Sequence, residues 1–268
     1  MPNLPDALWL NVSPSFQAFD RPLLHDLSQY IAVTQWEYSQ SMDEPASLDA
    51  ALDLLHEYLQ THHSSPDQTP TPIHLLGHSM GGVLALLYAR CHPEWVKSLT
   101  LLAVGYHLAI NWQAHYYTLL QMLLCDRQLL LRQMVCHLFG YPAASVVKNL
   151  ITSLEQDLEN SPTLHSLFKR GTIPSGGAPL PMLICGGQDD IIVDPVQLQR
   201  WKPELKPGDR LWQCPEGRHF FHYFYAELVS EQIISFWDRL QASDPLQNQQ
   251  SYSLRAGGID CKAPARER

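Results

Sequence analysis

The sequence predicts an α/β protein: a mostly parallel sheet of about six strands, flanked by helices, with an inserted helical cap. Short apolar runs of strand length alternate with amphipathic helical patterns through much of the 268 residues, and this alternation is typical of parallel sheets. Residues 105–178 interrupt it, because they hold helical patterns but no convincing strand. With 45% hydrophobic residues, a chain of this length can bury a sizeable core.

Four elements are predicted in the first 62 residues. Residues 7–12 read A-L-W-L-N-V, a short apolar run that predicts a buried strand. Residues 22–30 predict a helix, and residues 31–34 the next strand. A second helix is predicted over residues 47–62, because Ser47 is a suitable N-cap and apolar residues recur at helical spacing.

The next segment places a serine in a sharp turn between a strand and a helix. Residues 73–89 read I-H-L-L-G-H-S-M-G-G-V-L-A-L-L-Y-A, in which an apolar run ends at Gly77 and a helical run follows Ser79 at once. Such a turn crowds the positions two residues either side of the serine, so glycine is favoured at Gly77 and Gly81. Ser79 would then stand clear of the sheet, with the Met80 N–H at a helix N-terminus where it can face a developing oxyanion.

These residues resemble the α/β-hydrolase superfamily. The pattern G-H-S-M-G-G at residues 77–82 is followed by H-P-E at residues 92–94 and by an apolar strand at residues 98–104. The resemblance covers roughly residues 7–240. It implies the α/β-hydrolase fold and a Ser-acid-His triad in that chain order, with Ser79 as the nucleophile.

The sequence departs from the family in the loop after the first strand. There the family carries a His-Gly pair, and the residue after the pair supplies a second oxyanion N–H. Asn11 and Val12 occupy the positions of that pair here, so the resemblance makes Ser13 the donor. Valine does not allow the close backbone approach that glycine allows. The strands that usually precede this loop are also absent, which is why about six strands are expected.

Residues 105–178 correspond to the point at which many members of the superfamily carry a helical cap. Helices are predicted over residues 111–139, with a bend near Asp126, over residues 143–160 and over residues 161–170. Most of their leucines and methionines are expected to pack against one another.

Four aromatic side chains are candidates for contact with a substrate above Ser79. Trp112, Tyr116 and Tyr117 belong to the predicted cap, and His78 precedes the nucleophile. The remaining domain boundaries follow from the cap: residues 1–104 and 179–240 form the predicted core. The tail, residues 241–268, is rich in Gln, Ser, Gly and Arg and is predicted to be disordered.

The candidate acid follows a buried strand predicted over residues 180–186. Ligands of parallel sheets gather at the carboxyl ends of the strands, so a carboxylate just past such an end is well placed. The family's acid stands three residues after a glycine in the pattern G-x-x-D. Counting from Gly187 gives Asp190 and counting from Gly186 gives Asp189; the apolar residues after Asp190 favour that residue.

The candidate base lies in the loop after the last predicted strand, residues 208–214. The pattern G-R-H-F at residues 217–220 resembles the loop that carries the family's histidine, which makes His219 the base. His222 is the competitor three residues on. A final amphipathic helix is predicted over residues 226–240.

Composition argues against several other classes of protein. The net charge is −9, from 18 basic and 27 acidic residues, without a basic cluster before the last few residues, so no nucleic-acid partner is expected. The first residues lack a signal-peptide pattern, and the apolar stretch 116–139 is interrupted by Asp126, Arg127 and Arg132, so we expect a cytoplasmic protein without a membrane span. Six scattered cysteines show no zinc spacing, so no disulfide and no metal is expected.

The expected chemistry is hydrolysis of a carboxylic ester or thioester through an acyl-enzyme, without a cofactor. His219 would take the Ser79 proton, Asp190 would orient the imidazole, and the N–H groups of Met80 and Ser13 would bind the oxyanion. The expected partner is a small molecule with an apolar group. The same triad could serve an acyltransferase or a lyase, and the altered loop at Ser13 leaves open a non-catalytic ligand-binding protein on the same scaffold.

Overall fold

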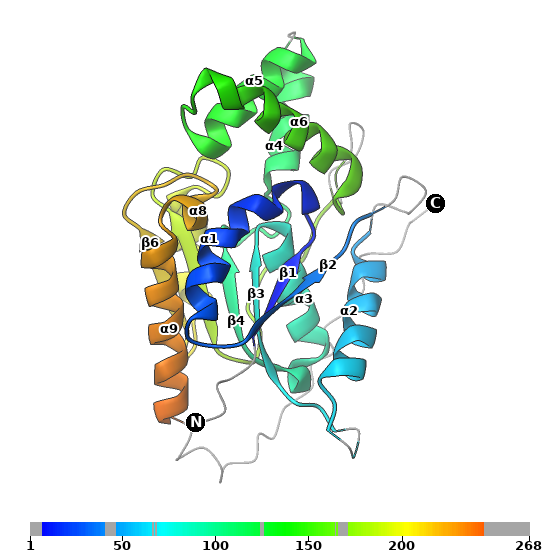
Figure 1. Cartoon of the computed structure of the whole chain (residues 1–268), viewed down its shortest axis with the longest axis vertical. Helices are drawn as coiled ribbons and strands as arrows, with labels where there is room; N and C mark the ends of the chain where they lie inside the picture. Colours follow the sequence, from blue (N-terminus) through cyan, green and yellow to red (C-terminus); the bar gives the residue numbers. More distant parts are fainter. Residues whose placement is uncertain are drawn as a thin grey trace.

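A computed structural model of the chain describes residues 7–40, 47–65, 67, 69–123, 126–163, 165 and 171–243. Among these residues, a sheet of six parallel strands runs in the order β2-β1-β3-β4-β5-β6 (Figure 1). This confirms the predicted fold class. The strands are β1 (Ala7–Asn11), β2 (Val33–Glu37), β3 (Ile73–His78), β4 (Val96–Leu102), β5 (Met182–Gly187) and β6 (Arg210–Cys214).

Helices connect the strands and cover both faces of the sheet. They are α1 (Gln17–Ser28), α2 (Asp49–His62), α3 (Met80–Cys91), α4 (Trp112–Met122), α5 (Arg127–Phe139), α6 (Ala144–Asn160), α7 (Pro195–Gln199), α8 (Phe221–Phe224) and α9 (Ala226–Ser243). Short 3-10 turns lie at η1 (Pro14–Phe16), η2 (Pro93–Trp95) and η3 (Lys202–Glu204). Since parallel strands need such crossovers, both faces of the sheet are buried and its central strands are almost continuously apolar.

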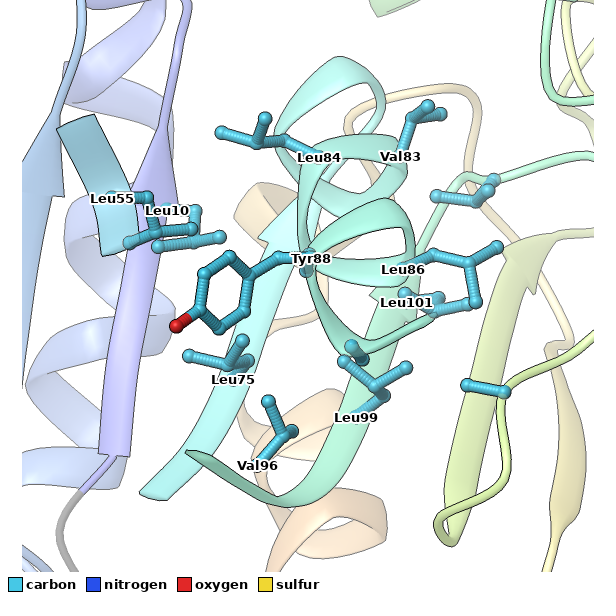
Figure 2. Close-up of a cluster of buried hydrophobic side chains, with 14 of the residues drawn as sticks. Leu10, Leu55, Leu75, Val83, Leu84, Leu86, Tyr88, Val96, Leu99 and Leu101 are labelled. Carbon is cyan, nitrogen blue, oxygen red and sulfur yellow. The ribbon is translucent and has the colours of Figure 1, made fainter. Parts of the chain in front are cut away.

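The face covered by α2 and α3 holds the larger core cluster. Alternate strand residues point toward it, as Leu8 and Leu10 do in β1. Figure 2 shows part of this cluster, in which the Tyr88 ring of α3 extends toward Leu10, Leu55 and Leu75. The packing fixes α3, and with it the turn that begins this helix, against the centre of the sheet.

The opposite face is covered by α1 and α9. Trp9, between Leu8 and Leu10 in β1, points to this side, as the period of two requires. The cluster also contains side chains of both helices and of the strands β3, β4 and β5: Leu23, Leu27, Leu76, Leu102, Leu183, Val229, Ile233 and Phe236.

The helices α4, α5 and α6 are inserted between β4 and β5 and lie together at one end of the molecule (Figure 1, green). Their apolar side chains form a third cluster that includes Phe16 of η1, Val193 after β5 and Phe220 after β6. The insertion therefore packs on loops that follow the carboxyl ends of strands. That residues 105–178 act as a cap, and residues 1–104 and 179–240 as a separate core, stays a prediction at this point.

The helix predicted over residues 111–139 is two helices, α4 and α5. Each begins at its own side-chain cap: Asn111 Oδ1 accepts a hydrogen bond from Ala114 N at 2.8 Å, and Asp126 Oδ2 accepts one from Gln128 N at 3.2 Å. A cap of this kind satisfies N–H groups in the first turn of a new helix. The chain therefore does not bend within one helix near Asp126 but begins a second helix there.

Two elements near the N-terminus begin at different residues than predicted. α1 begins at Gln17 rather than residue 22, so Pro22 lies inside the helix, and β2 spans Val33–Glu37 rather than residues 31–34. Three of the five residues of β2 are exposed polar residues, because it is an edge strand. The helix predicted at 161–170 lies mostly outside the described residues, as does the predicted tail beyond residue 243.

Candidate active site

Ser79 lies in a strained turn between β3 and α3. Its backbone has φ 50° and ψ −118°, and residues other than glycine seldom adopt this combination of torsion angles. The turn is held by a hydrogen bond from Ser79 N to Leu102 O at 2.8 Å. A methyl group on Gly77 would lie 2.4 Å from the Gly81 backbone, and one on Gly81 would lie 2.3 Å from Leu10 O, so both glycines are required sterically.

Asp190 and His219 form a buried pair. His219 Nδ1 lies 2.9 Å from Asp190 Oδ2, and both side chains have no exposed surface. The second oxygen of Asp190 accepts hydrogen bonds from the backbone N–H groups of Ile192 at 2.8 Å and Val193 at 3.1 Å. Asp189 is exposed. Of the two carboxylates left open by the sequence, Asp190 is the one beside the histidine.

The loops that carry this pair are joined by close backbone packing. A methyl group on Gly187 would lie 2.3 Å from Gly217 O, and Gly217 itself has φ 101°. Asp189 N donates a hydrogen bond to Gly217 O at 3.0 Å. These contacts bring the ends of β5 and β6 together and thereby fix the distance between Asp190 and His219.

His219 Nε2 points away from the acid and is buried without a hydrogen-bond partner among the described residues. His219 and Ser79 line the same pocket. With Nδ1 donating to Asp190, the neutral imidazole carries its lone pair on Nε2 and can accept a proton there.

His222 has different surroundings from His219. Its Nε2 lies 3.1 Å from Asp20 Oδ1, and the other oxygen of Asp20 accepts a hydrogen bond from Trp9 Nε1 at 2.9 Å. His222 is fully buried. It therefore joins α8 to α1 and β1, and the structure does not pair it with Asp190.

His78, a predicted substrate contact, lines the pocket but also supports the base. Its Nε2 donates a hydrogen bond to the carbonyl of His219 at 2.9 Å. Burial and the neighbouring imidazoles of His222 and His219 lower the pKa of His78 well below its usual value. A neutral His78 with its proton on Nε2 matches this contact.

The pocket over Ser79 is narrow and has mixed chemistry. Its lining includes apolar side chains, namely Trp9, Leu10, Val12, Phe16, Trp112 and Phe220, and polar ones, namely Asn11, Asp20, Gln113 and Asp157. The free space between them is about 20 Å³, enough for a water molecule. Trp112 thus lines the pocket, where the sequence predicts a substrate contact. Tyr116 packs against Trp112, and Tyr117 packs against Tyr116. Neither tyrosine is among the described residues that line this pocket.

The two expected oxyanion donors differ in what they contact. Met80 is the first residue of α3, so its N–H has no partner within the helix. Its thioether is held by Asn111, whose Nδ2 lies 3.1 Å from Met80 Sδ. Ser13 N, in contrast, already donates a hydrogen bond to the side chain of Asn11, at 3.0 Å from Oδ1.

Asp157 of α6 lines the pocket and was not singled out from the sequence. Trp112 Nε1 donates to its Oδ2 at 2.8 Å, Gln113 Nε2 to the same oxygen at 3.3 Å, and Ser161 Oγ to its Oδ1. Burial raises the pKa of Asp157 to about 6, although these hydrogen bonds act in the opposite direction. The sequence contains no signal for it, since one aspartate on an amphipathic helix is usually solvated.

Within the described ranges, no group of three His, Cys, Asp or Glu side chains is arranged to hold a metal ion. None of the described helices is long and apolar enough to cross a bilayer.

Comparisons with known proteins find a matching family model and a relative in sequence. The family model for the alpha/beta hydrolase fold matches residues 69–172. The uncharacterized protein alr2406 of Nostoc sp. (strain PCC 7120) is 45% identical over 242 residues, which cover 90% of this chain and 94% of that protein.

Solved structures show the same fold at low sequence identity. The hydrolase olei00960 from Oleispira antarctica has a TM-score of 0.65 at 16% identity and covers 88% of this chain and 91% of its own. The carboxylesterase CesB from Bacillus subtilis has a TM-score of 0.62 at 12% identity, and the match covers 88% of this chain and 85% of that one. With its six parallel strands, the matched family model over residues 69–172 and these structural neighbours, the chain has the α/β-hydrolase fold.

Proposed function

We propose that the protein is a serine hydrolase that cleaves a carboxylic ester or thioester through an acyl-enzyme. One observation carries the proposal: His219 has its Nδ1 hydrogen-bonded to buried Asp190 and its Nε2 unpartnered, and it lines the same pocket as Ser79. A histidine held in this tautomer beside a nucleophilic serine is what general-base catalysis requires. Resemblance to esterases of known structure supports the fold alone.

The proposed reaction runs in two halves. Ser79 Oγ attacks the carbonyl carbon as His219 Nε2 takes the hydroxyl proton, and the carbonyl electron pair moves to the oxygen, which faces Met80 N–H. The tetrahedral intermediate collapses, the bond to the alcohol or thiol breaks, and His219 returns the proton to that leaving group. Water then attacks the acyl-enzyme with the same base and releases the acid.

The lining of the pocket favours a substrate with an apolar group. Phe16, Trp112 and Phe220 supply aromatic surface, and each methylene buried against such surface contributes up to about 0.8 kcal/mol. The free volume of about 20 Å³ is too small for an acyl chain. The proposal therefore includes movement of α4 and α6, which we take to act as the cap.

One observation favours the non-catalytic alternative. The Ser13 N–H, which the family resemblance makes an oxyanion donor, is occupied by Asn11 Oδ1. A scaffold with one donor could bind an ester without turning it over. Transfer of the acyl group to an alcohol or amine uses the same first half-reaction and differs only in the second.

The test is steady-state turnover of p-nitrophenyl esters from acetate to octanoate, with Ser79→Ala as the matched inactive variant. We expect kcat/KM to rise with chain length in the wild type and to be lost in Ser79→Ala. The assay is then repeated with hydroxylamine. If hydroxylamine captures the acyl group without changing the rate of p-nitrophenol release, hydrolysis and capture proceed through the same acyl-enzyme. A wild type that releases p-nitrophenol no faster than Ser79→Ala contradicts the proposal.

A further inference from the structure

Asn11 stands at the end of β1, where it borders the candidate nucleophile. Its neighbour Leu10 pairs with Gly77 in β3, and the Leu10 carbonyl abuts Gly81 in the serine turn. Asn11 is 4% exposed, and it lines the pocket together with Ser79 and Met80. The carboxamide is thus enclosed at the same site where the Met80 N–H begins α3.

The orientation of the Asn11 carboxamide is fixed by its neighbour. Ser13 N–H is a donor, and the Asn11 atom 3.0 Å from it must therefore be the carbonyl oxygen, Oδ1. The other amide atom is then Nδ2, which carries two N–H groups. This Nδ2 is buried and has no hydrogen-bond partner among the described residues.

A buried amide donor without a partner is unusual in a folded protein and calls for a physical reason. Here the reason is supplied by the pocket that Asn11 lines, because an oxygen bound there would accept from Nδ2. The Ser13 N–H cannot serve that oxygen while it is bonded to Asn11 Oδ1. It acts instead as the group that holds the carboxamide in place.

We propose that Asn11 Nδ2 is the second oxyanion donor, paired with the Met80 N–H. The inference rests on the proposed function of Ser79, since an oxyanion forms only if the serine attacks a carbonyl. It also accounts for the residues that replace the family's His-Gly pair. When a side chain supplies the donor, the backbone need not approach the substrate, and the next position can hold valine. Val12 is 2% exposed, and it both packs in the larger core cluster and lines the pocket.

Two substitutions separate Asn11 from Ser13 as the donor. Asn11→Asp keeps an oxygen for the Ser13 N–H but replaces the amide donor with an acceptor. Asn11→Ala removes both atoms and frees the Ser13 N–H. If Asn11 Nδ2 is the donor, both variants lose about a hundredfold to a thousandfold in kcat, with KM changed little. If Ser13 N–H is the donor, Asn11→Ala keeps its turnover, and the proposal is overturned.

Asn149→Asp is the matched control, because it makes the same exchange on an exposed position of α6. It should leave kcat and Tm unchanged. Thermal melts show which Asn11 variants are folded, and a folded Asn11→Asp protein with wild-type kcat also overturns the proposal.

A structure of the wild type phosphonylated at Ser79 tests the geometry without any variant. The phosphoryl oxygen should lie roughly 2.7–3.1 Å from both Met80 N and Asn11 Nδ2. An oxygen placed against Ser13 N, or with no contact to Asn11, contradicts the inference while leaving the serine hydrolase intact. A wild type that neither reacts with the phosphonate nor turns over esters contradicts the proposed function itself.

Discussion

His219 and His222 belong to one short segment, yet their contacts assign them different work. The Nδ1 of His219 bonds to Asp190 and the residue lines the pocket with Ser79, whereas His222 bonds to Asp20 between α8 and α1 and is not among the described residues that line the pocket. Each histidine bonds to a carboxylate and has its other ring nitrogen buried without a partner among the described residues. Only a histidine in the same pocket as the nucleophile can take its proton, so His222 chiefly holds two elements together.

Substitution of these two histidines should therefore affect kcat to very different extents. His219→Ala is expected to lower kcat by on the order of a thousandfold or more, and it should also lower Tm, because it breaks a buried pair with Asp190. His222→Gln is expected to lower Tm, because it disturbs a buried hydrogen-bonded pair, and to change kcat by less than about tenfold. Paired kinetics and thermal melts check both. If His222→Gln were the variant with the greater loss of kcat, the assignment of the base would be wrong.

Asp157 should make the stability of the protein depend on pH. Burial raises its pKa from 3.8 to about 6 in the folded state, so between these values the folded protein binds the proton more tightly than the unfolded chain does. The stabilisation that comes from protonating Asp157 is then complete below about pH 4 and is lost as the pH rises through about 6. It adds as much as about 3 kcal/mol to the free energy of unfolding.

The measurement is the free energy of unfolding at several pH values for the wild type and Asp157→Asn. The difference between the two proteins should change between pH 4 and 6, because the asparagine does not titrate, and should be constant above about pH 7. If the difference in the free energy of unfolding between the two proteins stays constant between pH 4 and 6, Asp157 has an ordinary pKa.

The strand-turn-helix around Ser79 is the element whose geometry is most tightly determined. Gly81 is a residue of α3, where intrinsic propensity favours alanine over glycine by about 1 kcal/mol. The steric term is larger, because an added methyl group would lie 2.3 Å from Leu10 O. Backbone atoms on both sides must move to admit it.

Gly81→Ala should consequently destabilise the protein by about 2 kcal/mol or more. Gly105→Ala is the control, since the nearest atom to its added methyl group would be 3.5 Å away; it should change stability by less than about 1 kcal/mol. Denaturant unfolding of both variants checks the contrast. Equal stabilities would mean that the turn can relax and that Gly81 is not required sterically.

Elements were predictable from the sequence where the local pattern decides the structure. β1, β3 and β5 are apolar runs buried on both faces, and α2 carries a single apolar stripe, so each was located within two residues. β2 was misplaced because an edge strand with polar residues lacks that pattern. α1 was started too late because the proline at position 22 suggests a helix start, while the actual start depends on packing.

The site as a whole is assembled from segments that are far apart in the chain. Ser79, Asp190 and His219 were predictable because each lies in a short motif at the end of a strand, and parallel strands bring such ends together. Asp157 and the Asn11 carboxamide were not. The surroundings of Asp157 depend on the packing of α6 against η1. The bond from Ser13 N–H to Asn11 is local, but the burial of Asn11 Nδ2 without a partner among the described residues depends on the surrounding fold.

The central claim is that this assembly makes Ser79 a nucleophile, and covalent labelling tests it most directly. The protein is incubated with a fluorophosphonate and the modified peptide is identified by mass spectrometry, alongside Ser79→Ala and His219→Ala. The account predicts modification at Ser79 alone in the wild type, much slower modification in His219→Ala, and none in Ser79→Ala. Modification that persists in Ser79→Ala, or a wild type left unmodified at Ser79, would contradict it.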